Sequence, residues 1–252
     1  MAGGNCPLLD NIFNMNQQIV DNLFGFWEEI ADSGGFLGRE SDFKFSKPSG
    51  DSWPSKVFEV SSETDLTKLK EGIKNGTFPN SIGVHGGGIP EQGLKDSGFT
   101  KTSSINAMAF EDVDGWNGNS EDFGIVPVDS VEKSKVFARV ASRSFGCEVM
   151  EATVSSLYGH PSFSLFLGKH GDDYASCGIH FLDRNGISGL HMIGTLSEYR
   201  GFGLGKKMTL FLMRQAKINN SPRIYLVASK AGERIYTKLG FKVFGTLESY
   251  SL

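Results

Sequence analysis

The chain has 252 residues, of which 39% are hydrophobic and 21% charged, as in an ordinary folded domain. No apolar run reaches the roughly 18 residues of a membrane helix, and residues 1–13 lack the basic start and apolar stretch of a signal peptide, so we expect no membrane partner. Three scattered cysteines, Cys6, Cys147 and Cys177, match neither a disulfide framework nor zinc-ligand spacing. We therefore expect no metal site and a cytoplasmic location.

The net charge of −4 hides an uneven distribution along the chain. Residues 1–122 hold 9 Lys and Arg against 19 Asp and Glu, whereas residues 123–252 hold 16 against 10. A polyanionic ligand should prefer the second part and a cationic group the first. Two solvated surfaces that merely differ in charge are the alternative interpretation.

The first half begins with a long helical pattern. Apolar residues recur at helical spacing over residues 7–33, and two glycines end the run. The elements expected after it are short strands at 36–45 and 55–60, a helix at 62–74 capped by Thr64, a strand at 82–84, a helix at 90–97 and a strand-like stretch at 100–112. A polar, turn-rich segment at 116–122 places the expected domain boundary between residues 122 and 123.

The second half has clearer periodicity. The expected elements are a strand at 125–128, a helix at 130–145, strands at 163–167, 176–182 and 189–195, a helix from 204, a strand at 223–228, a helix at 231–238 and a closing strand at 241–245. A right-handed crossover would set strand 223–228 parallel to strand 189–195. Such a mixed sheet can splay there, and ligands bind near the carboxyl ends of parallel strands. The order predicts an α/β protein with a mixed sheet.

The stretch EYRGFGLGKK, residues 198–207, joins strand 189–195 to the next helix. The phosphate loop G-x-x-x-x-G-K-[ST] does not fit, because Arg200 stands where its first glycine is needed. The dinucleotide motif G-x-G-x-x-G fails at Lys206. The spacing R-x-x-G-x-G does fit, with Arg200, Gly203 and Gly205. Glycines here would let a pyrophosphate reach the free N–H groups that begin the helix.

This stretch, placed between a strand and an amphipathic helix, resembles the acetyl-CoA pyrophosphate loop of the GNAT N-acetyltransferases. Downstream, RIYLVAS and ERIYTKLGFKVFG resemble that family's fifth strand, fourth helix and sixth strand. The resemblance covers residues 123–252. The first half has no such glycine loop, but its LKDSGFTK echoes YTKLGFKV near the end of the chain. We therefore expect tandem GNAT-like acyl-CoA N-acyltransferase domains, a degenerate one at 1–122 and a competent one at 123–252.

The resemblance implies acetyl-CoA as co-substrate and no metal. It assigns cofactor binding to residues of one strand end, the glycine loop and one later serine, namely Ile193, Gly194, Thr195, Arg200, Gly201, Phe202, Gly203, Leu204, Gly205, Lys206 and Ser229. Ser229 stands where the family often has asparagine, and Gly232 where it often has alanine. The chain also ends soon after the sixth strand, so we expect the first half to complete that edge of the sheet.

Two residues take catalytic roles by the same resemblance. Tyr236 matches a tyrosine that many members use as general acid toward the leaving thiolate, although packing of its short helix is the alternative. His191 stands where many members have a glutamate base, and a structural histidine is its alternative. Strict alternation along a strand would put His191, Ile193 and Thr195 on one face.

The expected activity is acetyl-CoA-dependent N-acetylation of a primary amine of a small molecule or peptide, by direct attack in a ternary complex. No cysteine is placed to act as a nucleophile, and no nucleic-acid partner is expected. The acceptor would bind between the halves, where acidic groups of the first half could attract a cationic amine. The alternative is a non-catalytic acyl-CoA-binding sensor or interaction module. The sequence names neither the acceptor nor the oligomeric state.

Overall fold

The computed structural model describes residues 7–118 and 124–252, so Cys6 and the predicted boundary after residue 122 lie outside the described residues. The helices are α1 (Pro7–Ser33), α2 (Leu66–Lys74), α3 (Ile89–Asp96), α4 (Val131–Phe145), α5 (Glu151–Ser156), α6 (Leu204–Ile218) and α7 (Lys230–Lys238). The strands are β1 (Leu37–Arg39), β2 (Lys44–Ser46), β3 (Lys56–Phe58), β4 (Ile82–His85), β5 (Thr100–Phe110), β6 (Ile125–Pro127), β7 (Phe163–His170), β8 (Asp173–Leu182), β9 (Ser188–Thr195), β10 (Ile224–Ala228) and β11 (Lys242–Ser251).

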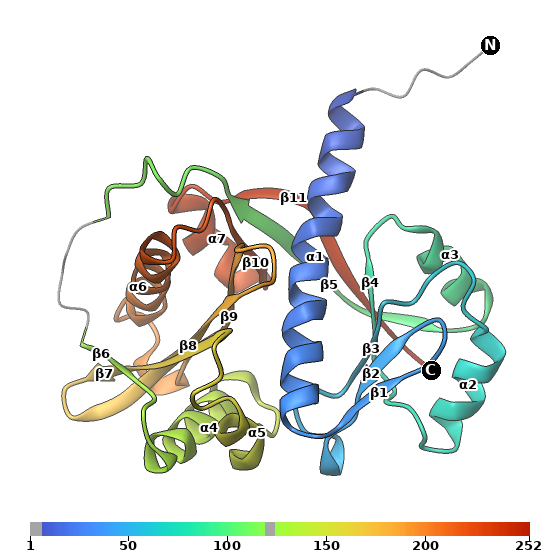
Figure 1. The fold of residues 1–252 in the computed structure, drawn as a ribbon, viewed down its shortest axis with the longest axis horizontal. Helices are drawn as coiled ribbons and strands as arrows, with labels where there is room; N and C mark the ends of the chain where they lie inside the picture. The colour runs from blue at the N-terminus through green and yellow to red at the C-terminus, as the bar shows by residue number, and fades with distance from the viewer. Residues whose placement is uncertain (1–6, 119–123) are drawn as a thin grey trace.

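All of these strands form one mixed sheet in the order β1-β2-β3-β4-β11-β5-β10-β9-β8-β7-β6. This confirms the predicted α/β class with a mixed sheet. Figure 1 shows the first half on one side, the second half on the other, and α1 crossing the sheet between them. The sheet is therefore continuous across the described parts of both halves.

Most predicted elements are present, with several differences. The stretch 36–45, predicted as one strand, forms the two antiparallel strands β1 and β2. The prediction missed α5, which is too short to show a period. The cap of α2 is Asp65, whose carboxylate accepts from the N–H groups of Thr67 and Lys68, and not Thr64. Thr64 instead donates its hydroxyl to the Asp42 carbonyl. The closing strand runs to Ser251, because β11 pairs with strands on both sides.

The two halves exchange strands at the centre of the sheet. β5 of the first half lies between β10 and β11, and β11 of the second half lies between β4 and β5. The register pairs Lys242 with Ala109 at one end and Ser251 with Thr100 at the other. The first half thus supplies the strand beside β10, as expected.

The Gly-Phe echo has a structural counterpart. Phe99 donates its N–H to the Leu94 carbonyl at the end of α3, and Phe241 donates to the Tyr236 carbonyl at the end of α7, both at 3.0 Å. Two residues after each helix lies a glycine with positive φ, +84° at Gly98 and +97° at Gly240, a conformation that glycine adopts without strain. The same turn therefore leads into β5 and into β11, as a duplicated unit would.

The parallel pair β9–β10 has only two residue pairs in register, Ile224 with Ser188 and Tyr225 with Gly189. Beyond them the strands separate toward their carboxyl ends. The predicted splay is confirmed, and it leaves the later backbone of β9 without a strand on that side.

Helices cover both faces of this sheet. α1, α4 and α5 share one hydrophobic cluster, which includes Phe26 and Phe181. On the other face α6 and α7 pack over the second half, and α2 and α3 over the first. Alternate residues of β4 point to opposite faces of the sheet. A Cβ at Gly83 would meet Trp27 of α1, whereas its neighbours Ile82 and Val84 pack with α2 and α3 on the other face. α1 therefore lies over the seam between the halves.

Candidate donor and acceptor site

The loop between β9 and α6 opens the start of α6 to solvent. Gly201 and Gly203 have φ of +90° and +78°, which other residues adopt only with strain. Gly203 is the N-cap residue and supplies no side-chain acceptor. Lys207 donates the first intrahelical bond, to the Gly203 carbonyl at 3.0 Å, so the preceding N–H groups of the turn remain available to an anion.

A cleft of about 620 Å³ lies between this loop, the end of β9 and the start of α7. It brings together every predicted cofactor residue except Phe202. The phenyl ring of Phe202 is exposed and stands against His170, with ring centroids 4.6 Å apart. The prediction missed the wall that α4 supplies at Ser144 and Phe145. No motif indicated these residues, because α4 lies far upstream and folds against the loop only in three dimensions.

A bulge in β9 corrects the predicted alternation. Cys177 pairs with Gly194 and Ile179 pairs with His191, so β9 has one more residue than β8 over this span. The backbone accommodates this extra residue at Met192, which has a φ of +50°. As a result Met192 packs with the α1 cluster and Ile193 with the α6 cluster. His191 and Ile193 therefore do not share a face, because strict alternation holds only in an unbulged strand.

Tyr236 lies on α7 and lines both the donor cleft and a second cavity. Its side chain is buried, which raises the pKa of the phenol to about 12. The hydroxyl donates no hydrogen bond to any described residue, so it is free to donate to a ligand. Gly232 makes room for the ring, since a Cβ there would lie 2.9 Å from Cε2 of Tyr236. The departure from alanine at this position thus has a steric reason.

His191 is buried beneath α1 and stacks on Phe26, with ring centroids 4.1 Å apart. Burial, with a smaller effect from His180, lowers the pKa of His191 to about 3. Its Nε2 and the Oδ1 of Asn22 are both buried without a hydrogen-bond partner, and a Cβ on Gly189 would lie 2.3 Å from each. The imidazole is therefore neutral at pH 7, with Nε2 directed toward α1.

Ser229 caps α7, because its hydroxyl oxygen accepts from the Gly232 N–H at 3.3 Å. The same side chain lines both cavities. Its hydroxyl proton remains available to an acceptor atom of a ligand. Arg200, at the mouth of the loop, donates to the Ser144 carbonyl at 3.4 Å and so ties the loop to α4.

The second cavity, here called the acceptor cavity, has a volume of about 350 Å³ and lies between the halves. Its wall is formed by residues of α1, β3, β5, α4, β9, β10, α7 and β11, with aromatic side chains that include Phe26, Trp27, Trp53 and Tyr236. It shares Phe145, Ile193, Ser229 and Tyr236 with the donor cleft. The two cavities therefore meet beside the Tyr236 phenol.

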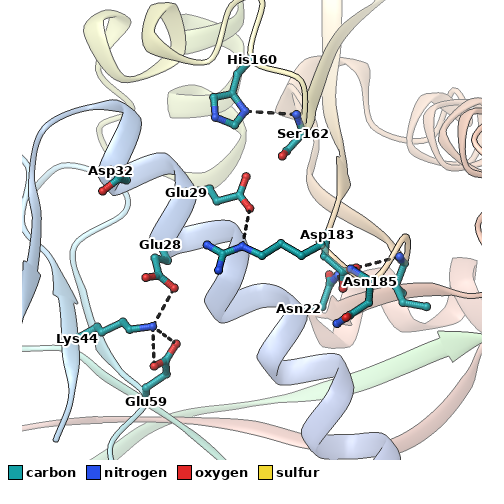
Figure 2. A network of polar contacts seen from close by, with 12 residues as sticks. Asn22, Glu28, Glu29, Asp32, Lys44, Glu59, His160, Ser162, Asp183 and Asn185 are labelled. Carbon is teal, nitrogen blue, oxygen red and sulfur yellow. Dashed lines mark hydrogen bonds and ion pairs between the residues drawn. The ribbon is translucent and has the colours of Figure 1, made fainter.

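No acidic side chain among the described residues of the first half lines the acceptor cavity. Asp21, Glu28, Glu29 and Glu59 line a separate groove of about 540 Å³ on the opposite side of α1, together with Asp183. Figure 2 shows part of this network, in which Glu28 and Glu59 both approach Lys44 at 2.9 Å. The expected attraction of a cationic amine by the acidic half is thus wrong for this cavity, because these carboxylates lie elsewhere and several are already paired.

The part of the chain in the structure shows no cluster of three or more His, Cys, Asp or Glu side chains that could hold a metal. Within the same residues, no helix combines the length and apolar character needed to cross a bilayer.

Comparison with known proteins identifies the fold. Residues 137–241 match the model of the Acetyltransferase (GNAT) family. No curated protein matches the chain in sequence. A GCN5-related N-acetyltransferase from Kribbella flavida superimposes with a TM-score of 0.66 at 16% identity, covering 85% of this chain and 88% of its own. A GCN5-related N-acetyltransferase from Sphaerobacter thermophilus gives 0.57 at 14%, covering 77% and 71%.

A Drosophila protein covers still more of the chain, 97% of it and 95% of its own length, with a TM-score of 0.56 at 14% identity. Likeness at such identities shows the fold alone, which is the GNAT fold over most of the chain. The family match adds that the second half carries a GNAT acetyltransferase domain at residues 137–241.

Proposed function

We propose that the protein is an acetyl-CoA-dependent N-acetyltransferase that acetylates a primary amine of a small molecule by direct attack in a ternary complex. The meeting of the donor cleft and the acceptor cavity at Tyr236 is the observation that carries this proposal. A volume of about 350 Å³ lies at the small end of ligand pockets and favours a small acceptor over a protein surface.

The residues of the donor cleft fit acetyl-CoA. The uncapped start of α6 and its two left-handed glycines form a cradle for a pyrophosphate, with Arg200 and Lys206 adding positive charge. The later residues of β9 leave an unpaired backbone edge, to which an extended amide-containing arm can add like a strand. Acetyl-CoA bound there would supply an acetyl thioester beside Tyr236.

In the transfer, the amine nitrogen forms a bond to the acetyl carbon, the carbon–sulfur bond breaks, the nitrogen loses a proton and the sulfur gains one. Tyr236 remains protonated at neutral pH because its pKa is about 12. A phenol this weak as an acid is poorly matched to protonating a thiolate, because the corresponding thiol has a pKa near 8.5. Its hydrogen bond to the charge that develops on sulfur is therefore the larger part of the role we propose for it.

Loss of the amine proton is the second requirement. The aromatic wall of the acceptor cavity disfavours an ammonium ion by desolvation, so an amine bound there is more easily neutral. The base role of His191 stays a prediction. With a pKa of about 3, His191 is far from the neutral value that suits a general base, and its Nε2 is directed toward Asn22 of α1.

Release of free thiol from acetyl-CoA, measured with a panel of primary amines, tests the proposal. We expect turnover by the wild type and a fall in kcat of about 100-fold for Tyr236→Phe, with acetyl-CoA affinity unchanged within about twofold. Tyr158, which is exposed, supplies the matched control Tyr158→Phe.

Acetyl-CoA binding without turnover of any amine would instead identify a binding module. Full activity of Tyr236→Phe would assign Tyr236 to packing alone.

A further inference from the structure

Lys56 is the one charged side chain among the described residues that line the acceptor cavity. It begins β3 of the first half, and its Nζ donates to the Ser81 hydroxyl at 2.5 Å. No carboxylate of the described residues comes within ion-pair distance of it. By contrast, Lys44 and Lys101 each pair with two carboxylates. Lys56 therefore lines the cavity without a carboxylate partner among the described residues.

The surroundings of Lys56 disfavour an ammonium group that has no anionic partner. Burial lowers the pKa of Lys56. The smaller, opposing effect comes from Cys147 as a thiolate, a form that burial of Cys147 disfavours. A buried charge is stable only when it is paired and hydrogen-bonded. An ammonium group has three donors, and Ser81 accepts one of them. An anionic group in the cavity would supply the missing partner.

The other residues of the cavity wall indicate which chemical groups such a ligand would carry besides the anion. Trp27 and Trp53 present apolar surface, as does Phe26. Ser103 and Ser249, directly opposite each other on β5 and β11, add two hydroxyl groups. No carboxylate among the described lining residues is present to hold a second positive charge. The cavity thus favours a molecule with one anionic group, an apolar body and an amine near Tyr236.

We propose that the acceptor is an amino acid, whose carboxylate pairs with Lys56 while its apolar side chain packs on Trp27 and Trp53 and its amine faces the donor cleft. This inference rests on the proposed N-acetyltransferase activity. The charge of Lys56 has a second effect, since a nearby cation disfavours the ammonium form of the acceptor and so helps to expose the nucleophilic lone pair.

Matched pairs of acceptors test this directly. Each pair consists of an amino acid and the amine that lacks its carboxylate: phenylalanine and 2-phenylethylamine, leucine and 3-methylbutylamine, alanine and ethylamine. We expect the wild type to prefer at least one amino acid by about 10-fold or more in kcat/KM, as a charge-assisted hydrogen bond provides. Lys56→Met should raise KM for that amino acid by about 10- to 100-fold and leave its carboxylate-free partner within about threefold.

Two further variants make the result specific. Lys56→Arg keeps the charge and should restore part of the preference, and thermal unfolding of both Lys56 variants checks that they are folded. Lys74 is exposed at the end of α2, so Lys74→Met is the control for loss of a lysine elsewhere.

A wild-type preference for the carboxylate-free amines would overturn the inference but leave the acetyltransferase activity intact. If Lys56→Met lowers kcat equally for an amino acid and for its carboxylate-free partner, the inference is also overturned, because Lys56 would then act on the amine and not on the carboxylate. Absence of turnover with every amine would instead overturn the proposed function.

Discussion

α2 follows β3 in the first half, and α6 follows β9 at the matching point of the second half. The two helices differ in whether a side chain caps their first N–H groups. In the first half Asp65 occupies the start of α2, and its carboxylate accepts from Thr67 and Lys68 at 3.0 and 3.1 Å. In the second half Gly203 leaves the start of α6 uncapped. A helix start whose N–H groups are capped by its own carboxylate has no free donors for a ligand anion, so of these two helix starts that of α6 is the one with donors available.

The helices that follow differ in the same sense. In the first half, Glu91 of α3 accepts from Lys95, Lys101 and the Tyr250 hydroxyl at 2.9, 2.7 and 2.8 Å, which ties α3 to β5 and β11. In the second half, Tyr236 of α7 leaves its hydroxyl free at the junction of two cavities. The position that matches Tyr236 is Leu94, which is fully buried. The matching positions of the first half are therefore taken up by internal contacts.

The largest effect is expected when the N-cap carboxylate of the first half is introduced into the second half. Gly203→Asp would put a carboxylate at the N-cap of α6, where we expect the pyrophosphate. Repulsion between like charges at about 4 Å should weaken CoA binding at least about 100-fold in titration calorimetry. Gly203→Asn is the matched control, because asparagine tolerates a similar backbone conformation without the charge. Equal affinities of the two variants would contradict the role given to the open helix start.

The next test removes the ionic tie of the first half. Glu91→Gln leaves Lys101 and Lys95 without their shared carboxylate, so the free energy of unfolding should fall by about 3 kcal/mol at pH 7, measured in urea. CoA affinity should not change, because Glu91 lines neither cavity. Glu71→Gln, on the exposed side of α2, is the control. A change in CoA affinity would show that the first half shapes the donor cleft.

The stabilisation that the Glu91 carboxylate provides depends on pH. Desolvation raises the pKa of Glu91, but hydrogen bonds from Lys101, Lys95, the Gly87 N–H and Tyr250 together hold it well below its usual range. Because the folded pKa is lowered, its stabilisation is complete above the unfolded value near 4.3 and is lost as pH falls toward the folded value. Glu91→Gln should therefore lose less stability than the wild type between pH 5 and pH 3.

The smallest test concerns the space around Tyr236. Gly232→Ala puts a Cβ within 2.9 Å of the ring, so kcat should fall about 3- to 10-fold as the phenol shifts, while α7 gains up to about 1 kcal/mol of helix propensity. Gly93→Ala in α3 is the control from the other half, since its Cβ would meet only an ordinary contact at 3.4 Å from Leu66. An unchanged kcat in Gly232→Ala would show that the ring position is not critical.

Local patterns predicted most of the fold and the donor side of the site. The helical period of α1, the turns between strands, and the spacing of Arg200, Gly203 and Gly205 are all properties of short segments. The bulge at Met192 was missed, because a positive φ at a non-glycine residue is set by pairing with β8. For the same reason the prediction that His191 and Ile193 share one face was wrong.

By itself, the sequence determined that a glycine loop begins a helix after a strand, because backbone freedom and free N–H groups follow from residue type and order. The tertiary structure decided what that loop faces. Exchange of β5 and β11 and the passage of α1 over the seam bring Trp27, Lys56 and Tyr236 to one cavity from distant parts of the chain. Such a wall depends on long-range packing, which no local pattern records.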